Sequence, residues 1–187
     1  MKLDKETEEK LKKEAIKCLK EGKPDWGIPH TLASVHWMRR LIEKEGGDEK
    51  ILVTTMYLHD IGYPVFRKRY SFDDVMQAKE EHVTRGVKIA RRILKKLGYP
   101  SSEIDKIAHL IEIHDKLDEI STKDEILVME ADGLAQIDTE KVKPTLDKEN
   151  HLKFLKHFRE ERIPRFKTKT GKKLLKQLFP IVEKYFD

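Results

Sequence analysis

Cysteine, apolar residues and long hydrophobic runs are all scarce in this chain of 187 residues. The single cysteine, Cys18, excludes an internal disulfide framework and favours a reducing compartment. It also leaves any metal site to histidine and carboxylate ligands. No apolar run approaches the length of a membrane-spanning helix, and the first residues lack the apolar stretch of a secretory signal peptide. We therefore expect a soluble, cytoplasmic protein with no membrane partner.

Charge is abundant by contrast. Charged residues make up 39% of the chain and apolar residues 38%, a balance typical of amphipathic helices with densely charged outer faces. The net charge of +5 is uneven, because residues 151–187 hold eleven Lys or Arg against four Asp or Glu. A basic segment can attract phosphate or nucleic acid, but such a run is usually a solvated helix face. We expect the part from Arg162 to Lys176 to be solvated surface.

Helical periodicity extends over the whole sequence, and no segment alternates as a strand would. We expect one all-α domain, residues 1–187, folded as a helical bundle without a linker or internal repeat. Start and stop signals delimit the helices. The expected helices cover about 3–21, 29–45, 48–59, a short segment from Ser71, 81–97, 101–115, a segment after Thr122 that carries Asp132, 147–161, and 170–186, the last disturbed by Pro180.

Capping residues mark the start of three of these helices. Asp48 precedes the helix that ends at His59, and Ser101 or Ser102 is expected to cap the helix that follows Pro100. Thr122 and, three residues later, a glutamate form a capping-box signature.

The most informative feature is the pair His59-Asp60, which ends the apolar run 51–58 and precedes the breakers Gly62 and Pro64. Such a run is expected to be buried, and an imidazole and a carboxylate at its end are costly to bury unless something satisfies them. A divalent cation would do so. A catalytic ion needs nitrogen and oxygen ligands from separate rigid elements and an open position for water. Further candidate ligands lie on other expected helices: His30, His82, His114 and Asp132.

The order and local context of these residues resemble the HD-domain superfamily of metal-dependent phosphohydrolases. The doublet stands in the segment 57–62, and His30 matches the first histidine, 29 residues before His59. His82 with Gly86, and the segments 111–114 and 130–134, match the later elements of the family pattern. The resemblance covers about residues 29–134 and implies a single-domain helical bundle of the HD-domain type. The C-terminal helices, within 147–187, match no motif.

His36 is a rival of His30 for the first position of the family pattern. The family has a small or basic residue and then Val shortly after its first histidine, and here Val35 is displaced by one position. We prefer His30, because helical phase places it with Ser34 on the stripe that packs inward. We interpret the histidines outside the set as core residues with one hydrogen bond: His36, His109, His151 and His157.

The resemblance implies a set of metal ligands. His30, His59, Asp60 and Asp132 would hold a first ion, His82 and His114 would hold a second one, and Asp60 would bridge them. Asp60, His82 and His114 are then the expected catalytic residues. Imidazole-rich sites with carboxylates favour Mn, Fe, Co, Ni or Zn over Ca or Mg, as one or two ions.

The implied activity is cleavage of a phosphate ester or anhydride of a small molecule, expected to be a nucleotide, by attack of metal-bound hydroxide. If only one ion binds, His82 or His114 would instead act as general acid for the leaving oxygen. Phosphate esters also need positive charge beside the metal, and Arg67, Lys68 and Arg69 in the loop after the doublet are the first candidates. A second basic group surrounds Thr168 and Gly171: Arg165, Lys167, Lys169 and Lys172. Tyr63 and Tyr70 either stack on a base or cover the core.

Two other functions stay open. Some HD-type proteins use the same six ligands to hold two irons and activate oxygen, so an HD-type di-iron oxygenase is the alternative, because ligands alone do not fix the reaction class. A weaker alternative is a basic nucleic-acid-binding module, whose binding would weaken steeply with salt. The apolar stripe of the last helix can serve as core or as a homodimer surface: Leu174, Leu178, Ile181, Val182 and Tyr185.

Overall fold

The computed structural model describes residues 1–22, 24–64 and 70–187, and within these ranges every regular element is helical. This confirms the all-α class. None of the described helices combines the length and the apolar character that crossing a membrane requires. The elements are α1 (Lys5–Glu21), α2 (Pro24–Glu45), α3 (Glu49–Leu58), α4 (Phe72–Lys96), α5 (Ser101–Ile113), α6 (Lys123–Ile137), α7 (Lys148–His157), a π-helical turn (Phe158–Arg162), a 3₁₀ turn (Ile163–Arg165) and α8 (Lys169–Glu183).

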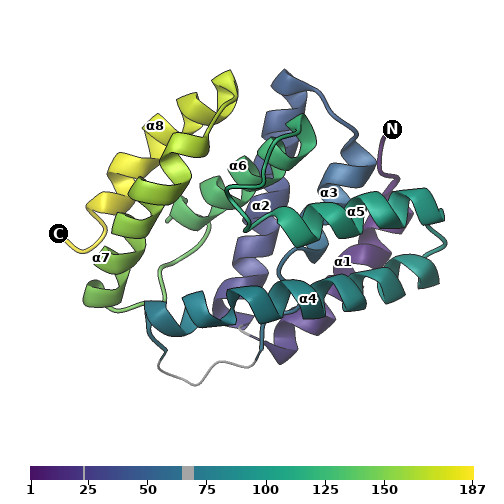
Figure 1. The fold of residues 1–187 in the computed structure, drawn as a ribbon, viewed down its shortest axis with the longest axis horizontal. Coiled ribbons are helices and arrows are strands. Elements are labelled where there is room, and N and C mark those ends of the chain that lie inside the picture. Colours follow the sequence, from purple (N-terminus) through teal and green to yellow (C-terminus); the bar gives the residue numbers. More distant parts are fainter. Residues whose placement is uncertain (23, 65–69) are drawn as a thin grey trace.

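Helix α2 is the centre of the arrangement. It contacts α1, α3, α6 and α8, and Figure 1 shows it crossing the middle of the bundle. Helices α4 and α5 lie side by side on one flank, and α7 and α8 lie together on the other. The core between α2, α3 and α6 includes three apolar side chains with 0% exposure: Met38, Leu52 and Leu127. The residues that follow α3 and α5, His59 and His114, are buried as well, at 0% and 1% exposure.

Two helix starts differ from the expectation. Helix α2 begins at Pro24 rather than near Pro29, so Pro29 lies inside the helix, where its ring nitrogen cannot donate the usual hydrogen bond. Helix α4 begins at Phe72 and absorbs both the short helix expected from Ser71 and the one expected from residue 81. Ser71 caps it, because its hydroxyl accepts the N–H of Asp74. The N-terminal turns of α4 are thereby fixed beside α7.

The predicted caps at Asp48 and Thr122 are confirmed. The Asp48 carboxylate accepts the N–H of Ile51, and Thr122 and Glu125 form a reciprocal capping box. The cap predicted at Ser101 or Ser102 is wrong, because both serines lie inside α5 and no side chain caps its first turn.

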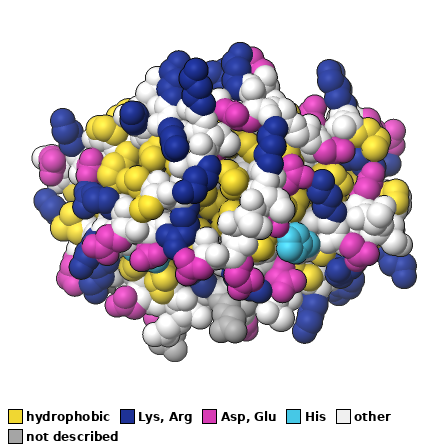
Figure 2. Space-filling view, turned by 45° about the horizontal axis from the view of Figure 1, so that its top comes forward, with side chains coloured by type: hydrophobic (Ala, Val, Ile, Leu, Met, Phe, Trp, Pro, Cys, Tyr) yellow, Lys and Arg dark blue, Asp and Glu magenta, His cyan; other side chains and the backbone are white. Residues whose placement is uncertain are grey.

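The apolar stripe of α8 is mostly core. Val182 is buried, and Leu174 and Leu178 pack against the core, whereas Ile181 and Tyr185 are exposed. Pro180 lies inside the helix, which continues to Glu183. A homodimer formed through this face remains a prediction. Figure 2 shows acidic and basic side chains interspersed on the face that it presents.

Candidate metal centre

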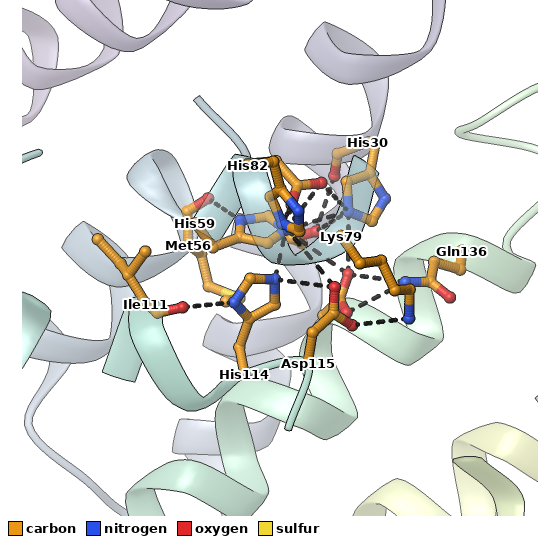
Figure 3. A network of polar contacts seen from close by, with 12 residues as sticks. His30, Met56, His59, Lys79, His82, Ile111, His114, Asp115 and Gln136 are labelled. Atoms are coloured by element: carbon orange, nitrogen blue, oxygen red, sulfur yellow. Dashed lines mark hydrogen bonds and ion pairs between the residues drawn. The ribbon is translucent and has the colours of Figure 1, made fainter. Parts of the chain in front are cut away.

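Four imidazoles and three carboxylates meet in the interior of the bundle, and Figure 3 shows side chains of this network pointing toward one another. They come from five places in the chain. All have side chains that are 10% exposed or less. The residues are His30 on α2, His59 and Asp60 after α3, His82 on α4, His114 and Asp115 after α5, and Asp132 on α6.

The doublet reaches the interior because α3 ends there. Every residue of α3 from Ile51 to Leu58 is buried, and His59 is the C-cap of the helix. The chain then turns, with the N–H of Tyr63 donating to the Asp60 carbonyl over 3.3 Å. Consecutive side chains of a regular helix diverge, so the end of the helix allows His59 and Asp60 to face one centre.

Gly62 lets this turn touch α4. A Cβ atom at position 62 would lie 2.0 Å from the His82 carbonyl oxygen and 2.4 Å from the Gly86 nitrogen, far inside contact distance. The backbone after the doublet is therefore pressed against the turn of α4 that carries His82. This contact fixes the distance between Asp60 and the His82 imidazole. In the sequence, Gly62 gives only the signal of a helix breaker.

Gly62→Ala is expected to lower the free energy of unfolding by about 3 kcal/mol and to weaken metal binding, because the added methyl group must displace α4. Gly86→Ala is the matched control. Its Cβ would meet nothing closer than the Gly62 nitrogen at 3.6 Å, so it should be neutral or stabilise the protein by up to about 1 kcal/mol through helix propensity. Urea unfolding and metal titration measure both. Equal effects of the two variants would contradict the close approach.

Asp60 divides the cluster into two halves. Its Oδ2 atom lies 3.3 Å from His30 Nε2 and 3.4 Å from His59 Nε2. Its Oδ1 atom lies 3.5 Å from His82 Nε2 and 3.6 Å from His114 Nε2. Asp132 joins the first half, with Oδ1 at 3.0 Å from His30 Nε2 and 3.5 Å from His59 Nε2. One carboxylate therefore faces two pairs of imidazole nitrogens.

The imidazoles present lone pairs toward this centre. His59 Nδ1 lies 2.9 Å from the Met56 carbonyl oxygen, and His114 Nδ1 lies 2.7 Å from the Ile111 carbonyl oxygen. A carbonyl oxygen only accepts, so each Nδ1 carries a proton and donates it. In a neutral ring the Nε2 atom is then an acceptor that faces carboxylate oxygens, which are acceptors as well.

Acceptors that face acceptors need a cation between them. His30 Nε2 and His59 Nε2 are only 3.1 Å apart, and within the described residues His82 Nε2 has no hydrogen-bond partner. Nitrogen and oxygen donors in this arrangement, with the His59 and His114 rings each held by a backbone carbonyl, suit a divalent transition metal. The residues present therefore fit a metal centre.

Protons are the competing cations. Burial lowers the pKa of His59, but Asp60 and Asp132 raise it by more, to about 9. The pKa of His114 is also raised, because Asp115 and Asp60 outweigh burial. Burial raises the pKa of Asp60, yet the surrounding imidazoles hold it well below its usual range. The cluster thus attracts positive charge, and metal binding should release protons.

Asp115 and Arg162 belong to the cluster, although the sequence did not single them out as site residues. Asp115 Oδ2 lies 3.7 Å from His114 Nε2 and 3.8 Å from His82 Nε2. Arg162 donates from Nη2 to Asp115 Oδ1 over 2.6 Å, and its Nη1 lies 2.8 Å from Asp132 Oδ2. One guanidinium therefore joins carboxylates from both halves. The His114-Asp115 doublet was the signal in the sequence for Asp115.

The expectation that Arg162 belongs to a solvated surface is wrong. Its side chain is 2% exposed, and it enters the interior from a π-helical turn, a feature that is frequent at functional sites. Burial of an arginine is tolerated here because two carboxylates pair with it. Lys79 Nζ, at 3.2 Å, adds a second cation to Asp115. Burial raises the pKa of Asp115, but Lys79, His114 and Arg162 lower it further than burial raises it.

Aromatic rings and an amide hold the cluster from outside. The Trp26 ring stacks on His30 with centroids 4.1 Å apart, and the Tyr63 ring stacks on His82 at 3.9 Å. Tyr63 thus covers an imidazole of the cluster. Gln136 Nε2 donates to both carboxylate oxygens of Asp132 over 3.1 Å. Such partners fix the orientation of ligands.

The histidines outside the cluster have several environments. His36 is exposed, which agrees with the preference for His30, and His109 is exposed and contacts Glu125 at 2.9 Å. The interpretation of these two as core residues is wrong. His151 is buried, with Nε2 at 3.4 Å from the Val182 carbonyl oxygen, and His157 is half-buried.

Two basic groups were expected to contact phosphate, and the structure describes only the second of them. Arg67, Lys68 and Arg69 lie outside the described residues. In the second group, Arg165 pairs with Asp118 and Glu161. Members of that group do not line the cavity that opens on the cluster. Lys79 and Arg162 line it instead.

The comparisons with known proteins agree with the motifs. The family model of the HD domain matches residues 27–137, so the chain belongs to the HD-domain family. The crystal structure of a predicted HD superfamily hydrolase from an uncultured Thermotogales bacterium has a similar fold, with a TM-score of 0.64 and 16% identity over 95% of this chain and 87% of that chain. Among curated proteins, none matches significantly. Family membership and the cluster together support a metal-dependent hydrolase.

Proposed function

We propose that this protein is a metal-dependent phosphohydrolase that cleaves a phosphate ester or anhydride of a small molecule, with a nucleotide as the first candidate. The observation that carries the proposal is the Asp60 carboxylate, which faces a pair of imidazole nitrogens on each side. This arrangement suits two cations with one bridging carboxylate. Manganese, iron, cobalt, nickel and zinc suit the donor set.

The residues divide naturally into two ligand sets. His30, His59 and Asp132 with Oδ2 of Asp60 would hold one ion, and His82 and His114 with Oδ1 of Asp60 would hold the other. When bound, such ions supply an activated water at neutral pH and stabilise charge on the phosphoryl oxygens.

The protein's own groups have separate tasks. Hydrolysis forms a bond from phosphorus to the water oxygen, breaks the bond to the leaving oxygen and transfers a proton to that oxygen. Lys79 and Arg162 would balance negative charge beside the cluster. Nε2 of His82 or His114 would hold the proton for the leaving oxygen if one ion binds alone.

We propose further that residues 1–187 act as one domain. The family match ends at residue 137, but Arg162, from beyond it, pairs with Asp115 and Asp132 inside the cluster. A chain shortened after Ile137 is therefore expected to lose metal binding.

Phosphate release from a panel of nucleotides and simple phosphate esters tests the activity, with the protein loaded in turn with manganese, cobalt or nickel. Turnover that requires metal is the expected result. Metal that stays bound without release of phosphate from any compound would contradict it. Oxygen consumption by the iron-loaded protein, in the absence of phosphate release, would favour the di-iron oxygenase.

A further inference from the structure

The cavity beside the cluster has two kinds of wall. Its acidic lining residues, Asp60, Asp115 and Asp132, all belong to the cluster. Away from the cluster the wall is mostly apolar and comes from the N-terminal turns of α2 and α4, from α7 and from the loop before it. The principal apolar lining residues are Trp26, Phe72, Val75, Met76, Leu146 and Phe154.

The lysine and arginine side chains of the described wall already pair with carboxylates of the cluster. Among the described lining residues, the lysine is Lys79 and the arginine is Arg162. Lys79 pairs with Asp115, and Arg162 pairs with Asp115 and Asp132. His151 and His157 also line the cavity, and burial lowers the pKa of both, which favours their neutral forms.

Each additional phosphate of a di- or triphosphate brings negative charge that needs its own donors. Among the described lining residues, lysine and arginine lie only beside the cluster, where a single phosphoryl group would lie. Beyond that point the described wall is mostly aromatic and aliphatic, with Thr145, His151 and His157 among its polar residues.

The cavity is also small. It measures about 100 Å³, less than the roughly 150 Å³ of an apolar cavity that holds benzene, so it encloses only a small group. Hydroxyl groups placed against apolar side chains lose their hydrogen bonds to water without replacement. A polyol body is therefore disfavoured, and a short hydrocarbon body is favoured.

Resting on the proposed phosphohydrolase activity, but in place of the nucleotide named there as first candidate, we propose that the substrate is a phosphomonoester with a small apolar body, such as a short alkyl group, rather than a nucleoside di- or triphosphate. The phosphoryl group would lie at the cluster beside Lys79 and Arg162. The body would lie against Trp26, Phe72 and Met76.

The discriminating experiment compares pentyl phosphate, glycerol 3-phosphate and a nucleoside triphosphate as substrates of the metal-loaded protein. The first two have bodies of similar size and both leave as primary alkoxides, so their intrinsic reactivity is similar. The expected kcat/KM is at least about tenfold higher for pentyl phosphate, mainly through KM. Equal or better turnover of glycerol 3-phosphate or of the triphosphate would overturn the proposal.

A wall variant tests the contact directly. Met76→Ala removes an apolar lining side chain, and Gln77→Ala changes its exposed neighbour on α4 as the matched control. Met76→Ala is expected to raise KM for pentyl phosphate about tenfold and to leave glycerol 3-phosphate nearly unchanged. An equal loss for both esters would show that the wall does not contact the body, against the proposal.

Binding of pentylphosphonate, which cannot be hydrolysed, separates this proposal from the proposed function. Calorimetry should show binding to the metal-loaded protein with a negative heat-capacity change, the mark of apolar burial. Binding without hydrolysis of any ester would refute the hydrolase and support the substrate class. Hydrolysis that favours glycerol 3-phosphate would support the hydrolase and refute the apolar substrate class.

Discussion

Asp60→Asn is expected to abolish metal binding in both halves of the cluster and to lower phosphate release by about a thousandfold or more. Asn keeps the shape of the side chain but removes the charge that faces four imidazole nitrogens. The carboxyl has a pKa well below its usual range, so its charge is present at every working pH. Among the residues that the structure describes, no other one contacts both halves through separate carboxylate oxygens.

Elemental analysis of the purified variant and its rate of phosphate release measure the effect. Asp105→Asn is the matched control, because Asp105 is 66% exposed and pairs with Arg91 on the surface of α4, away from the cluster. It should keep both metal and activity. If Asp60→Asn retained metal in the ratio of the parent protein, Asp60 would not be the bridging group.

Arg162→Met is expected to lower the free energy of unfolding of the metal-free protein by about 3–5 kcal/mol, because it removes the guanidinium that pairs with two buried carboxylates, of which Asp115 keeps a second cationic partner, Lys79. Methionine replaces much of the apolar stem and none of the charge. The free energy of unfolding of Arg162→Lys should lie between those of the parent protein and of Arg162→Met, because an ammonium cannot donate to both carboxylates in the geometry of the guanidinium. Urea unfolding in the presence of a chelator measures all three proteins.

Arg159→Met provides the control for this position. Arg159 lies in the same π-helical turn, is 54% exposed and pairs with Glu183, so its loss should cost less than about 1 kcal/mol. Combining Arg162→Met with Asp132→Asn should restore part of the stability, since one of the two carboxylates that lose the guanidinium is then neutral. A variant Arg162→Met as stable as Arg159→Met would show that the guanidinium is dispensable.

Local patterns made most of the cluster predictable. Helical phase separated His30 from His36, and the apolar run 51–58 indicated that His59 and Asp60 are buried. The capping box at Thr122 located the start of α6, which carries Asp132. Each of these signals lies within a few residues of the group that it predicts. The family resemblance then supplied what local patterns lack, which is the knowledge that these helices meet.

Arg162 could not be predicted in this way. It stands 47 residues after Asp115 and lies in a π-helical turn that follows no periodic pattern. Its charged neighbours along the chain resemble those of a solvated helix. Lys79 also has no local signal, because its partner Asp115 belongs to a different helix end. Pairings of this kind depend on tertiary packing, and only the structure shows them.

The number and position of bound ions test the account most directly. Anomalous scattering from crystals of the manganese-loaded protein should show two peaks per chain. One should lie among His30, His59, Asp60 and Asp132, and the other among Asp60, His82 and His114. A single peak, or manganese bound away from these side chains, would contradict the two-ion centre.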